Sequence, residues 1–392
     1  MKINAEDYND FSIQEPLDSK MSSGSLSPFT FLCLLIILVG SGLLFLYSAS
    51  SYVAIQNNLP HFYYLKKQLI FALLGFALFF LIQRLPFRFF KIMSWPLIVI
   101  AVILLSLTVF TPFGVTSLGA TRWLKLPFVP SFQPSELSKA CLILFLAYWF
   151  SEEKHKKYIG WFYVIPIFVI LVCVGLILLQ HAFTTSLIVF LIAFLMLLVC
   201  GIKFRYLFVA GLFLIVPTVC ILFSQSYRIK RVFSFLFPEV DKTGVNWQVN
   251  NSLQAISSGG LFGKGLGNGV FKQGALPEIE SDFIFANIAE EQGMLGIIFV
   301  IGLFVLFAIL GIRTYERAIK YSKYNAYLAF GVTCLITVQT LINLCVVLGL
   351  LPPTGIPLPF FSLGGTNLLI LITLSGLLYK VMRENNKIYG KE

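Results

Sequence analysis

Residues 257–296 read SSGGLFGKGLGNGVFKQGALPEIESDFIFANIAEEQGMLG and join a glycine-rich half to an acidic, apolar half. Glycine suits backbone that adopts unusual dihedral angles or approaches another element closely, and the first half contains Gly259, Gly260, Gly263, Gly265, Gly267, Gly269 and Gly274. The second half carries the carboxylates Glu278, Glu280, Asp282, Glu290 and Glu291. One interpretation is a solvated loop that leads into a helix. The other is a reaction site at a membrane surface.

The composition of the chain indicates a polytopic membrane protein. Of the 392 residues, 58% are hydrophobic and only 12% are charged, and the mean hydropathy is +0.86; soluble globular domains are far less apolar. The cysteines lie inside apolar runs and form no CxxC pair, so the sequence implies neither a disulfide framework nor a metal site. They are Cys33, Cys141, Cys173, Cys200, Cys220, Cys334 and Cys345.

Apolar runs of roughly 20 residues predict membrane-spanning helices. We predict ten, at about residues 29–50, 66–84, 90–111, 135–151, 160–180, 183–201, 204–224, 283–313, 325–350 and 364–383. Residues 1–28 are polar and do not resemble a cleavable signal peptide, so we predict a disordered tail before the first span. The predicted fold class is therefore an all-α membrane domain over residues 29–383, followed by a short tail, 384–392.

Basic residues in the short loops predict the orientation of the helices. Lysine and arginine are concentrated in alternate turns and in the C-terminal tail, which places the N- and C-termini in the cytoplasm. The long segment 225–282 then lies outside, as do the connections 112–134 and 351–363. Each of these three segments carries polar or glycine- and proline-rich signals that a plain helical connection does not need.

The outer segment 112–134 and the helix after it contain a group of charges. Glu136 and Lys139 are three residues apart and share one helix face. They form either an ion pair that fixes packing or part of an outward cavity, because ions at this depth are paired or face polar space. In the second case Arg122 and Lys125 would face an anionic ligand, since the arginine fork suits phosphate oxygens.

A second basic cluster follows the predicted seventh helix, in the sequence YRIKR over residues 227–231. Arg228 and Arg231 contact either anionic headgroups or the pyrophosphate of a ligand, and the sequence does not choose between the two.

Asp282 lies where the outer loop meets the predicted eighth helix. It suits a helix N-cap, and it equally suits a general base at the bilayer surface, where partial desolvation tunes a carboxylate. Glu290 and Glu291 follow about two turns later, and one of them could be buried against a cation while the other faces a cavity. Gly293 would then permit a bend in the helix.

The last outer segment, residues 349–367, reads GLLPPTGIPLPFFSLGGTN. Its prolines and glycines predict a rigid re-entrant turn, because irregular backbone at membrane depth must be buried or line a cavity. We expect this uncharged turn to form a wall, with Ser362 as its candidate contact to a substrate. The sequence contains no zinc signature, Walker A loop or GxSxG elbow, and its three histidines are scattered.

These segments together resemble the SEDS family (shape, elongation, division and sporulation), the peptidoglycan glycan polymerases. The resemblance begins near residue 29 and is carried by TRWLKL and FQPSELSK over 121–139, YRIKRVFSFLFP over 227–238, the stretch 257–293 and the turn 349–367. The sequence GLGNG over residues 265–269 and the polar N-terminal tail are more similar to the cell-division branch of the family than to its elongation branch.

The resemblance implies an enzyme of the bacterial cytoplasmic (inner) membrane that joins lipid II into β-1,4 glycan strands and releases undecaprenyl pyrophosphate outside. The family's essential acid maps to Asp282. Expected partners are lipid II, a class B penicillin-binding protein and other divisome membrane proteins, without nucleic acid. A divalent cation, Mg²⁺ or Mn²⁺, could assist, but no ligand set is legible and no cofactor is assigned.

One departure keeps other functions open. The family's Gln-Pro-Asp-x-Gly-Thr segment reads QHAFTT over residues 180–185, so Ala182 stands where the family has aspartate. A scaffold that recruits the penicillin-binding protein without catalysis therefore competes with the polymerase. A lipid II flippase or other transporter competes as well, because ten helices with intramembrane ions suit it equally. A transporter needs its charged site near the middle of the bilayer, whereas Asp282 is expected at the outer surface.

Overall fold

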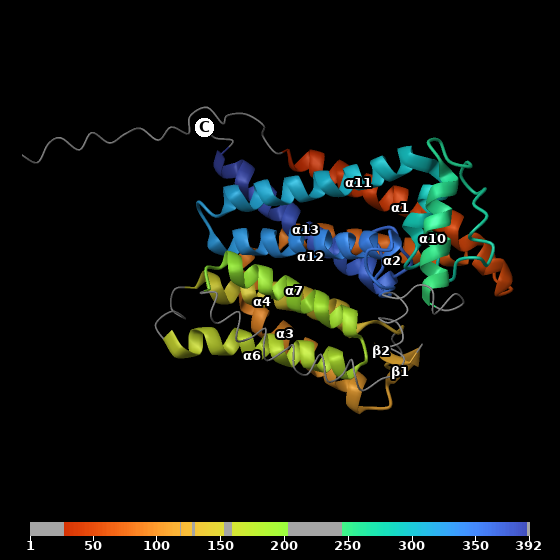
Figure 1. Cartoon of the computed structure of the whole chain (residues 1–392). Helices are drawn as coiled ribbons and strands as arrows, with labels where there is room; N and C mark the ends of the chain where they lie inside the picture. Colours follow the sequence, from red (N-terminus) through yellow and green to blue (C-terminus); the bar gives the residue numbers. More distant parts are fainter. Residues whose placement is uncertain (1–26, 118, 128–129, 153–158, 203–244, 390–392) are drawn as a thin grey trace, which may run out of the picture.

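The structure of the protein is a computed structural model. It describes residues 27–117, 119–127, 130–152, 159–202 and 245–389. Within these ranges nine long helices correspond to nine of the predicted spans, and Figure 1 shows most of them running side by side as a bundle. They are α1 (Pro28–Gln56), α2 (Tyr63–Arg84), α3 (Phe87–Phe110), α4 (Pro134–Ser151), α6 (Ile159–Leu179), α7 (Phe183–Val199), α11 (Ile284–Ala318), α12 (Lys323–Val347) and α13 (Gly365–Tyr389). The predicted helix 204–224 and the tail 1–26 lie outside the described residues.

Seven of the described helices are long and apolar enough to cross a membrane, and they include all of the nine except α4 and α7. Helix α4 carries an ion pair near its start, and α7 has only 17 residues. The chain is therefore a multi-pass membrane protein.

Helices α12 and α13 form the centre of the bundle. In the most apolar window of each, 67% of the residues are buried, against 28% in α2 and α3. Helix α13 packs on α2, while α12 packs on α11 and α4. Because α2 and α3 are much less buried in the bundle than α12 and α13, polar side chains that need partners are expected on the central helices.

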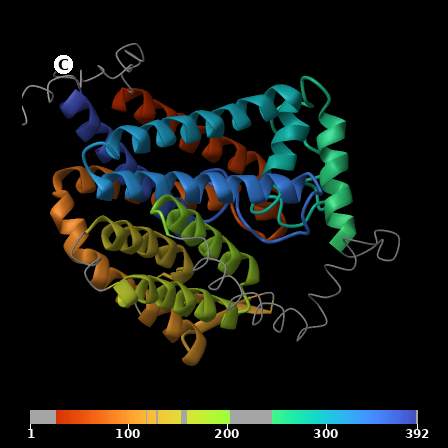
Figure 2. The same cartoon turned by 60° about the vertical axis from the view of Figure 1, so that its left-hand side comes forward.

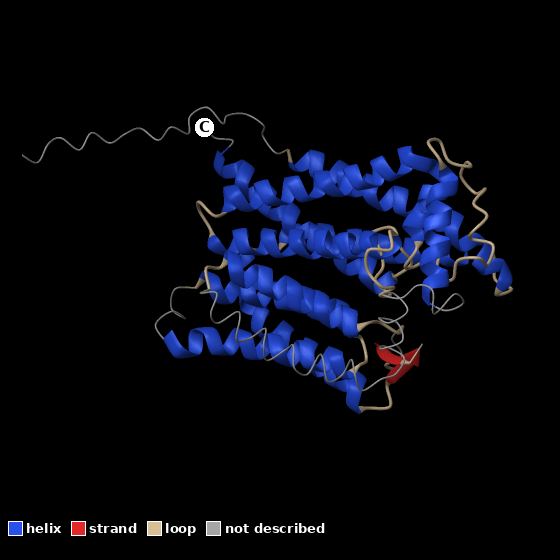
Figure 3. Ribbon diagram, in the orientation of Figure 1, coloured by secondary structure: helices blue, strands red, loops and turns tan. Residues whose placement is uncertain are grey.

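The all-α prediction needs one correction. Strands β1 (Gly114–Ser117) and β2 (Ala120–Leu124) form an antiparallel hairpin within the predicted outer connection 112–134, and Figure 3 shows these strands at one end of the bundle. β-Branched and aromatic residues in this short segment favour strand over helix.

The long outer segment 225–282 contains a helix that was not predicted from the sequence. Helix α10 (Val245–Gly259) packs on α11 and lies across the ends of the bundle helices (Figure 1). Its buried face includes Ser252, whose hydroxyl donates to the carbonyl of Val347 at 2.8 Å. The segment is too polar for a span, and its role is to cover one end of the bundle.

Helix α11 breaks at Gly293, whose φ of 64° and ψ of −155° are not helical. Figure 2 shows the chain turning sharply where the short first segment of α11 meets the long second one. The expected bend is therefore present, at the glycine that tolerates positive φ.

The glycine-rich loop after α10 satisfies the backbone groups that this break leaves open. In an unbroken helix the N–H of Met294 would donate to the carbonyl of Glu290. Here it donates to the carbonyl of Gly260 (2.9 Å), and the Glu290 carbonyl accepts from the backbone of Lys264 (3.0 Å). The same exchange is repeated one residue along, with the donor–acceptor pairs Leu295–Leu261 and Gly265–Glu291. The loop is thus joined to α11 by backbone hydrogen bonds on both sides of the break.

The predicted helix 364–383 ends too early, because α13 continues to Tyr389. Asn385 is buried, accepts from the hydroxyl of Tyr321 at 2.6 Å and donates to the carbonyl of Thr314 at 3.1 Å. These contacts hold the extra turns against the end of α11. Hydropathy alone predicts an earlier end of the helix, because these last turns are polar.

Candidate functional site

Asp282 lies in a tight turn immediately before α11. The carbonyl of Glu278 accepts hydrogen bonds from the backbone N–H groups of Ser281, Asp282 and Phe283, and Glu278 has a φ of 55°. The N-cap position belongs to Phe283, without a side-chain cap bond. Capping therefore does not explain the carboxylate of Asp282, which is partly exposed.

Asn343 of α12 ties this turn to the re-entrant segment. Its Nδ2 donates to the carbonyl of Asp282 and to the carbonyl of Ile356, each at 2.8 Å. The side chain is 1% exposed, so water competes little for these bonds. One amide thus fixes Asp282 relative to the proline-rich segment that faces it.

Gly355, in that segment, lies between the candidate acid and the candidate cation. A Cβ atom built on Gly355 would be 3.5 Å from Oδ2 of Asp282 and 3.7 Å from Nη1 of Arg122. Gly355 has a φ of 71°, which a residue with a side chain adopts only with strain. The carboxylate of Asp282 and the guanidinium of Arg122 therefore both lie beside Gly355. Because Gly355 has no side chain, it leaves the space next to these two groups open.

The hairpin positions Arg122. Val115 pairs with Trp123 and Thr116 pairs with Thr121, so Arg122 is the extra residue of a bulge. Bulges re-aim side chains and are common near functional sites. Lys125, just after β2, is exposed and donates its backbone N–H to the carbonyl of Phe113 at 3.0 Å.

The turn between α6 and α7 supports the same hairpin. The backbone N–H of Thr121 donates to the carbonyl of Gln180 at 3.1 Å. Ala182, two residues later, is only 1% exposed. The family's aspartate would lie in a buried position here, and burying a charge without a partner is costly.

Glu136 and Lys139 form a buried ion pair, with Nζ and Oε2 2.8 Å apart and both residues at most 5% exposed. Asn367 of α13 donates to Glu136 at 2.7 Å, and Lys139 donates to Gln339 of α12 at 3.3 Å. Gln339 in turn donates to the carbonyl of Pro357 at 3.1 Å. These contacts favour the packing interpretation, with the pair supporting the re-entrant segment from inside the bundle.

Glu290 is fully buried and has several donors. Its carboxylate accepts from Nζ of Lys264 (2.7 Å) and from the backbone N–H groups of Val270 (2.8 Å) and Phe271 (3.2 Å). The glycine-rich loop therefore wraps this carboxylate.

Glu291 is fully buried as well, against a second cation. Nζ of Lys272 lies 2.7 Å from Oε1, and the hydroxyl of Ser48 in α1 lies 2.6 Å from Oε2. The expectation that one of the two glutamates faces a cavity was wrong, because the loop supplies a lysine to each.

Ser362 has a structural role in the protein. It is 5% exposed, its hydroxyl accepts from the backbone N–H of Leu358 at 2.8 Å, and its carbonyl accepts from Gln68 of α2 at 3.0 Å. These bonds brace the re-entrant segment, whose Ile356 and Phe361 are also buried. The predicted buried, irregular turn is therefore present, and Ser362 holds it in shape.

Glu280 joins the Asp282 turn to the same segment. Its carbonyl accepts from the backbone N–H of Leu363 at 2.8 Å. Burial raises the pKa of the Glu280 carboxyl, and the neighbouring charge of Glu278 raises it further. Glu280 therefore has a partly desolvated carboxyl only two residues from Asp282.

Arg228 and Arg231 lie outside the described residues. Among the residues that are described, no group of three or more histidine, cysteine, aspartate or glutamate side chains could hold a metal ion. We therefore derive no step through a divalent cation.

Three polar residues that brace the site were not predicted from the sequence, namely Asn343, Gln339 and Gln68. Gln339 and Asn343 are four residues apart in an apolar helix, so they share one face. Two amides on one face of a spanning helix signal polar partners inside the bundle, and this pattern could have identified them.

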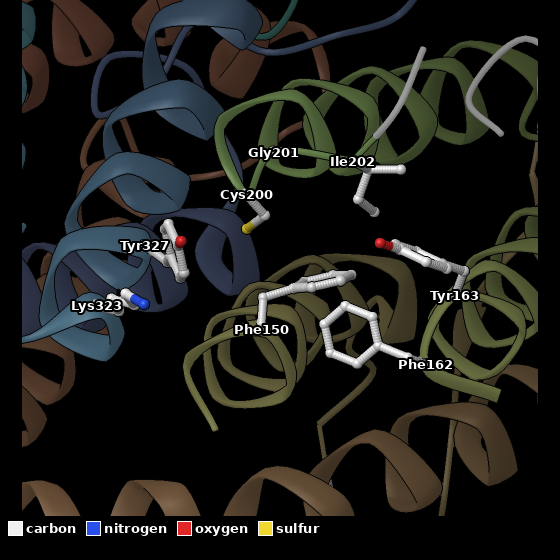
Figure 4. A pocket seen from close by; sticks show the side chains of 8 residues that line it. All are labelled: Phe150, Phe162, Tyr163, Cys200, Gly201, Ile202, Lys323 and Tyr327. Carbon is white, nitrogen blue, oxygen red and sulfur yellow. The ribbon is translucent and has the colours of Figure 1, made fainter. Parts of the chain in front are cut away.

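A cavity of about 440 Å³ lies at the other end of the bundle, and Figure 4 shows the side chains that line it. Its lining residues are Phe150, Phe162, Tyr163, Cys200, Gly201, Ile202, Lys323 and Tyr327. Lys323 begins α12 and Asn343 lies near its other end, so the cavity is separated from Asp282 by roughly 30 Å along the helix. None of the predicted site residues lines it.

Comparisons with known proteins agree over nearly the whole chain. The model of the FtsW, RodA and SpoVE family, described as "Cell cycle protein", matches residues 29–387. The probable peptidoglycan glycosyltransferase FtsW of Trichlorobacter lovleyi is 34% identical over 351 residues, which cover 89% of this chain and 91% of that protein. The protein of the same name from Borreliella burgdorferi is 35% identical over 356 residues, covering 90% and 96%.

Solved structures give the same result. A chain from a study of the structural coordination of polymerization and crosslinking by a peptidoglycan synthase complex is 28% identical, with a TM-score of 0.72 and coverage of 91% of this chain and 98% of that one. The rod shape determining protein RodA of Thermus thermophilus is 27% identical, with a TM-score of 0.65 and coverage of 91% and 97%. The resemblance stated from the motifs is confirmed, and the chain belongs to the FtsW, RodA and SpoVE family of cell cycle proteins.

Proposed function

We propose that this protein polymerises peptidoglycan glycan strands from lipid II during cell division. The observation that carries the proposal is the convergence of Asp282 and Arg122 on Gly355. The relatives named as probable peptidoglycan glycosyltransferases support the reaction class, and their name FtsW supports the division branch.

The proposed reaction needs one base and one anion site. Asp282 accepts the proton of the acceptor sugar's 4-hydroxyl as that oxygen attacks the anomeric carbon of the donor. The new bond is the β-1,4 glycosidic bond, and the bond that breaks joins the anomeric carbon to the pyrophosphate. Arg122 stabilises the negative charge that develops on the leaving undecaprenyl pyrophosphate, and Lys125 adds a second positive charge nearby.

We propose ten spans in the bacterial inner membrane, with both termini in the cytoplasm and the Asp282 end outside. Support comes from the charge distribution, since Arg313, Arg317 and Lys320 follow the apolar run of α11 at the other end. The tenth span is the predicted helix 204–224, and Arg228 and Arg231 after it would add to the pyrophosphate site.

A class B penicillin-binding protein is the partner that we propose, with other divisome membrane proteins around the pair. A polymerase alone leaves strands uncrosslinked, and the similar synthase complex is described as coordinating polymerization with crosslinking.

Two other functions are compatible with an intramembrane ion network. A flippase would need its charged site near the middle of the bilayer. Asp282 instead precedes α11, and the amide that holds it, Asn343, lies one turn before the end of α12. A site at the end of the bundle favours the polymerase over the flippase. A scaffold would need no such convergence of charges.

The test is lipid II polymerisation in detergent micelles, where transport across a bilayer has no meaning. The purified protein is assayed with its partner, whose transpeptidase is blocked by penicillin, and glycan strands are separated by length. We expect strands of many disaccharides. Failure to form strands, together with lipid II translocation in proteoliposomes, would establish the transporter instead. Partner binding with neither activity would establish the scaffold.

A further inference from the structure

The tip of the glycine-rich loop carries two large apolar side chains that the bundle leaves uncovered. Leu261 is 66% exposed and Phe262 is 79% exposed, and no other described large apolar side chain is more exposed than Phe262. A loop in water normally presents polar residues. Contiguous exposed apolar residues instead mark a contact with protein or membrane.

The hydrogen bonds between the loop and α11 fix the depth of this tip relative to the membrane. The second segment of α11 is uncharged from Met294 to Ile312 and reaches Arg313 at the far end. These residues span roughly 28 Å at about 1.5 Å per residue, close to the thickness of a hydrocarbon core. Met294 therefore lies near the boundary of that core, at the Asp282 end.

The tip lies at the same level. The backbone N–H of Met294 donates to Gly260, and a Cβ atom built on Gly293 would be 2.7 Å from the carbonyl of Leu261. On α11 itself, the neighbouring Leu295 is 59% exposed. The apolar surface that α11 presents to lipid therefore continues onto the loop.

The charged side chain near the tip, that of Lys264, does not prevent the tip from contacting lipid. Lys264 donates to the buried Glu290 at 2.7 Å, and its side chain is 31% exposed. Its charge is thus neutralised on the protein side, while the remaining exposed surface of the side chain can reach headgroups.

We propose that Leu261 and Phe262 insert among the lipid acyl chains of the leaflet at the Asp282 end. The loop then anchors α11 at a fixed depth. The inference requires only that the bundle spans a membrane. It depends neither on which compartment this end faces nor on the proposed polymerase activity.

Photocrosslinking in lipid nanodiscs tests the proposal. The probe p-benzoylphenylalanine is placed at Phe262 in the full chain, and lipid adducts are measured by mass spectrometry after irradiation. Val305, on the exposed face of α11, is the lipid-facing reference position, and Gln273, an exposed polar residue of the same loop, is the aqueous one. A second probe at Leu261 guards against a local folding defect at Phe262.

We expect adduct yields at both tip positions within about twofold of Val305 and at least about fivefold above Gln273. Yields at the tip equal to that at Gln273 would overturn the proposal. Repeated in native membranes, the experiment would also overturn it if the probe at Phe262 captured a protein and no lipid.

Discussion

Asp282 and the pair Glu290–Glu291 lie within ten residues of one another but have opposite environments. Asp282 is partly exposed, with its backbone held by Asn343 and its carboxylate beside the point that Gly355 leaves open. The two glutamates are fully buried, each against its own lysine. One acidic stretch therefore has two uses. The buried glutamates fix the loop and α11, and the turn before α11 presents the partly exposed carboxylate of Asp282.

The largest effect on stability is expected from the locked side of this comparison. Glu291→Ala leaves Lys272 buried without its carboxylate, and breaking a buried pair in this way costs about 3–5 kcal/mol. We expect the thermal unfolding midpoint in detergent to fall sharply. Glu278→Ala, which removes an exposed carboxylate from the same stretch, is the control and should change it little.

A double variant sharpens this prediction. Glu291→Ala combined with Lys272→Met removes both charges and should recover part of the lost stability. Equal midpoints for Glu291→Ala and the wild type would show that the pair does not hold the frame.

On the accessible side of the comparison, Arg122 is expected to have a large effect on activity, though a smaller one than Asp282. Arg122→Ala removes the guanidinium beside Asp282 and should lower kcat/KM for lipid II by about 10–100-fold, since charge-assisted bonds contribute about 1.5–3 kcal/mol. Lys125→Ala should have a smaller effect because Lys125 is exposed. Lys320→Ala, at the other end of the bundle, is the control for charge. An unchanged dependence of the rate on lipid II concentration in Arg122→Ala would argue against a phosphate role.

Substitution of Gly355 tests whether the substrate uses the space between Asp282 and Arg122. Gly355→Ala should cost about 1–2 kcal/mol of stability because of its positive φ, and the new methyl should lower polymerisation further by occupying the space between Asp282 and Arg122. Gly267→Ala has the same conformational cost at a φ of 86° with nothing within 4 Å. If the two variants polymerise equally well, the space at Gly355 is not used by substrate.

The smallest effect is expected at Glu280, as a pH dependence. Its pKa is raised in the folded protein, so the folded chain holds this proton more tightly than the unfolded chain does. The free energy of unfolding should therefore fall as pH rises from the ordinary carboxyl pKa through the folded one. Glu280→Gln should remove that slope and raise the unfolding midpoint at neutral pH. Unfolding midpoints measured across this pH range check it, and an unchanged slope would contradict it.

The spans could be predicted because a bilayer demands about 20 apolar residues, and this physical constraint is visible in hydropathy alone. Hydropathy does not report contacts between segments, and this explains the errors. Helix α13 extends to Tyr389 through Asn385. The hairpin and α10 lie in two separate outer segments, both too polar to be identified as spans.

The site was predicted in part, for similar reasons. Asp282 and Arg122 could be selected because acid and base chemistry restricts the residue types. Their meeting at Gly355 depends on a bulge in β2, which has no local sequence signature, and on Asn343, whose place in an apolar helix indicates a polar partner but not which one. The locking of Glu290 and Glu291 required knowing that the loop returns Lys264 and Lys272 to α11.

The most direct test of the account is glycan formation by Asp282→Asn, assayed as a purified complex with the partner transpeptidase and lipid II. The substitution keeps the size of the side chain and removes the base. We predict that the rate falls by at least about 100-fold, while the unfolding midpoint and partner binding stay at wild-type values. Glycan strands formed at the wild-type rate by this variant would contradict the account, because the accessible carboxylate would then have no part in the reaction.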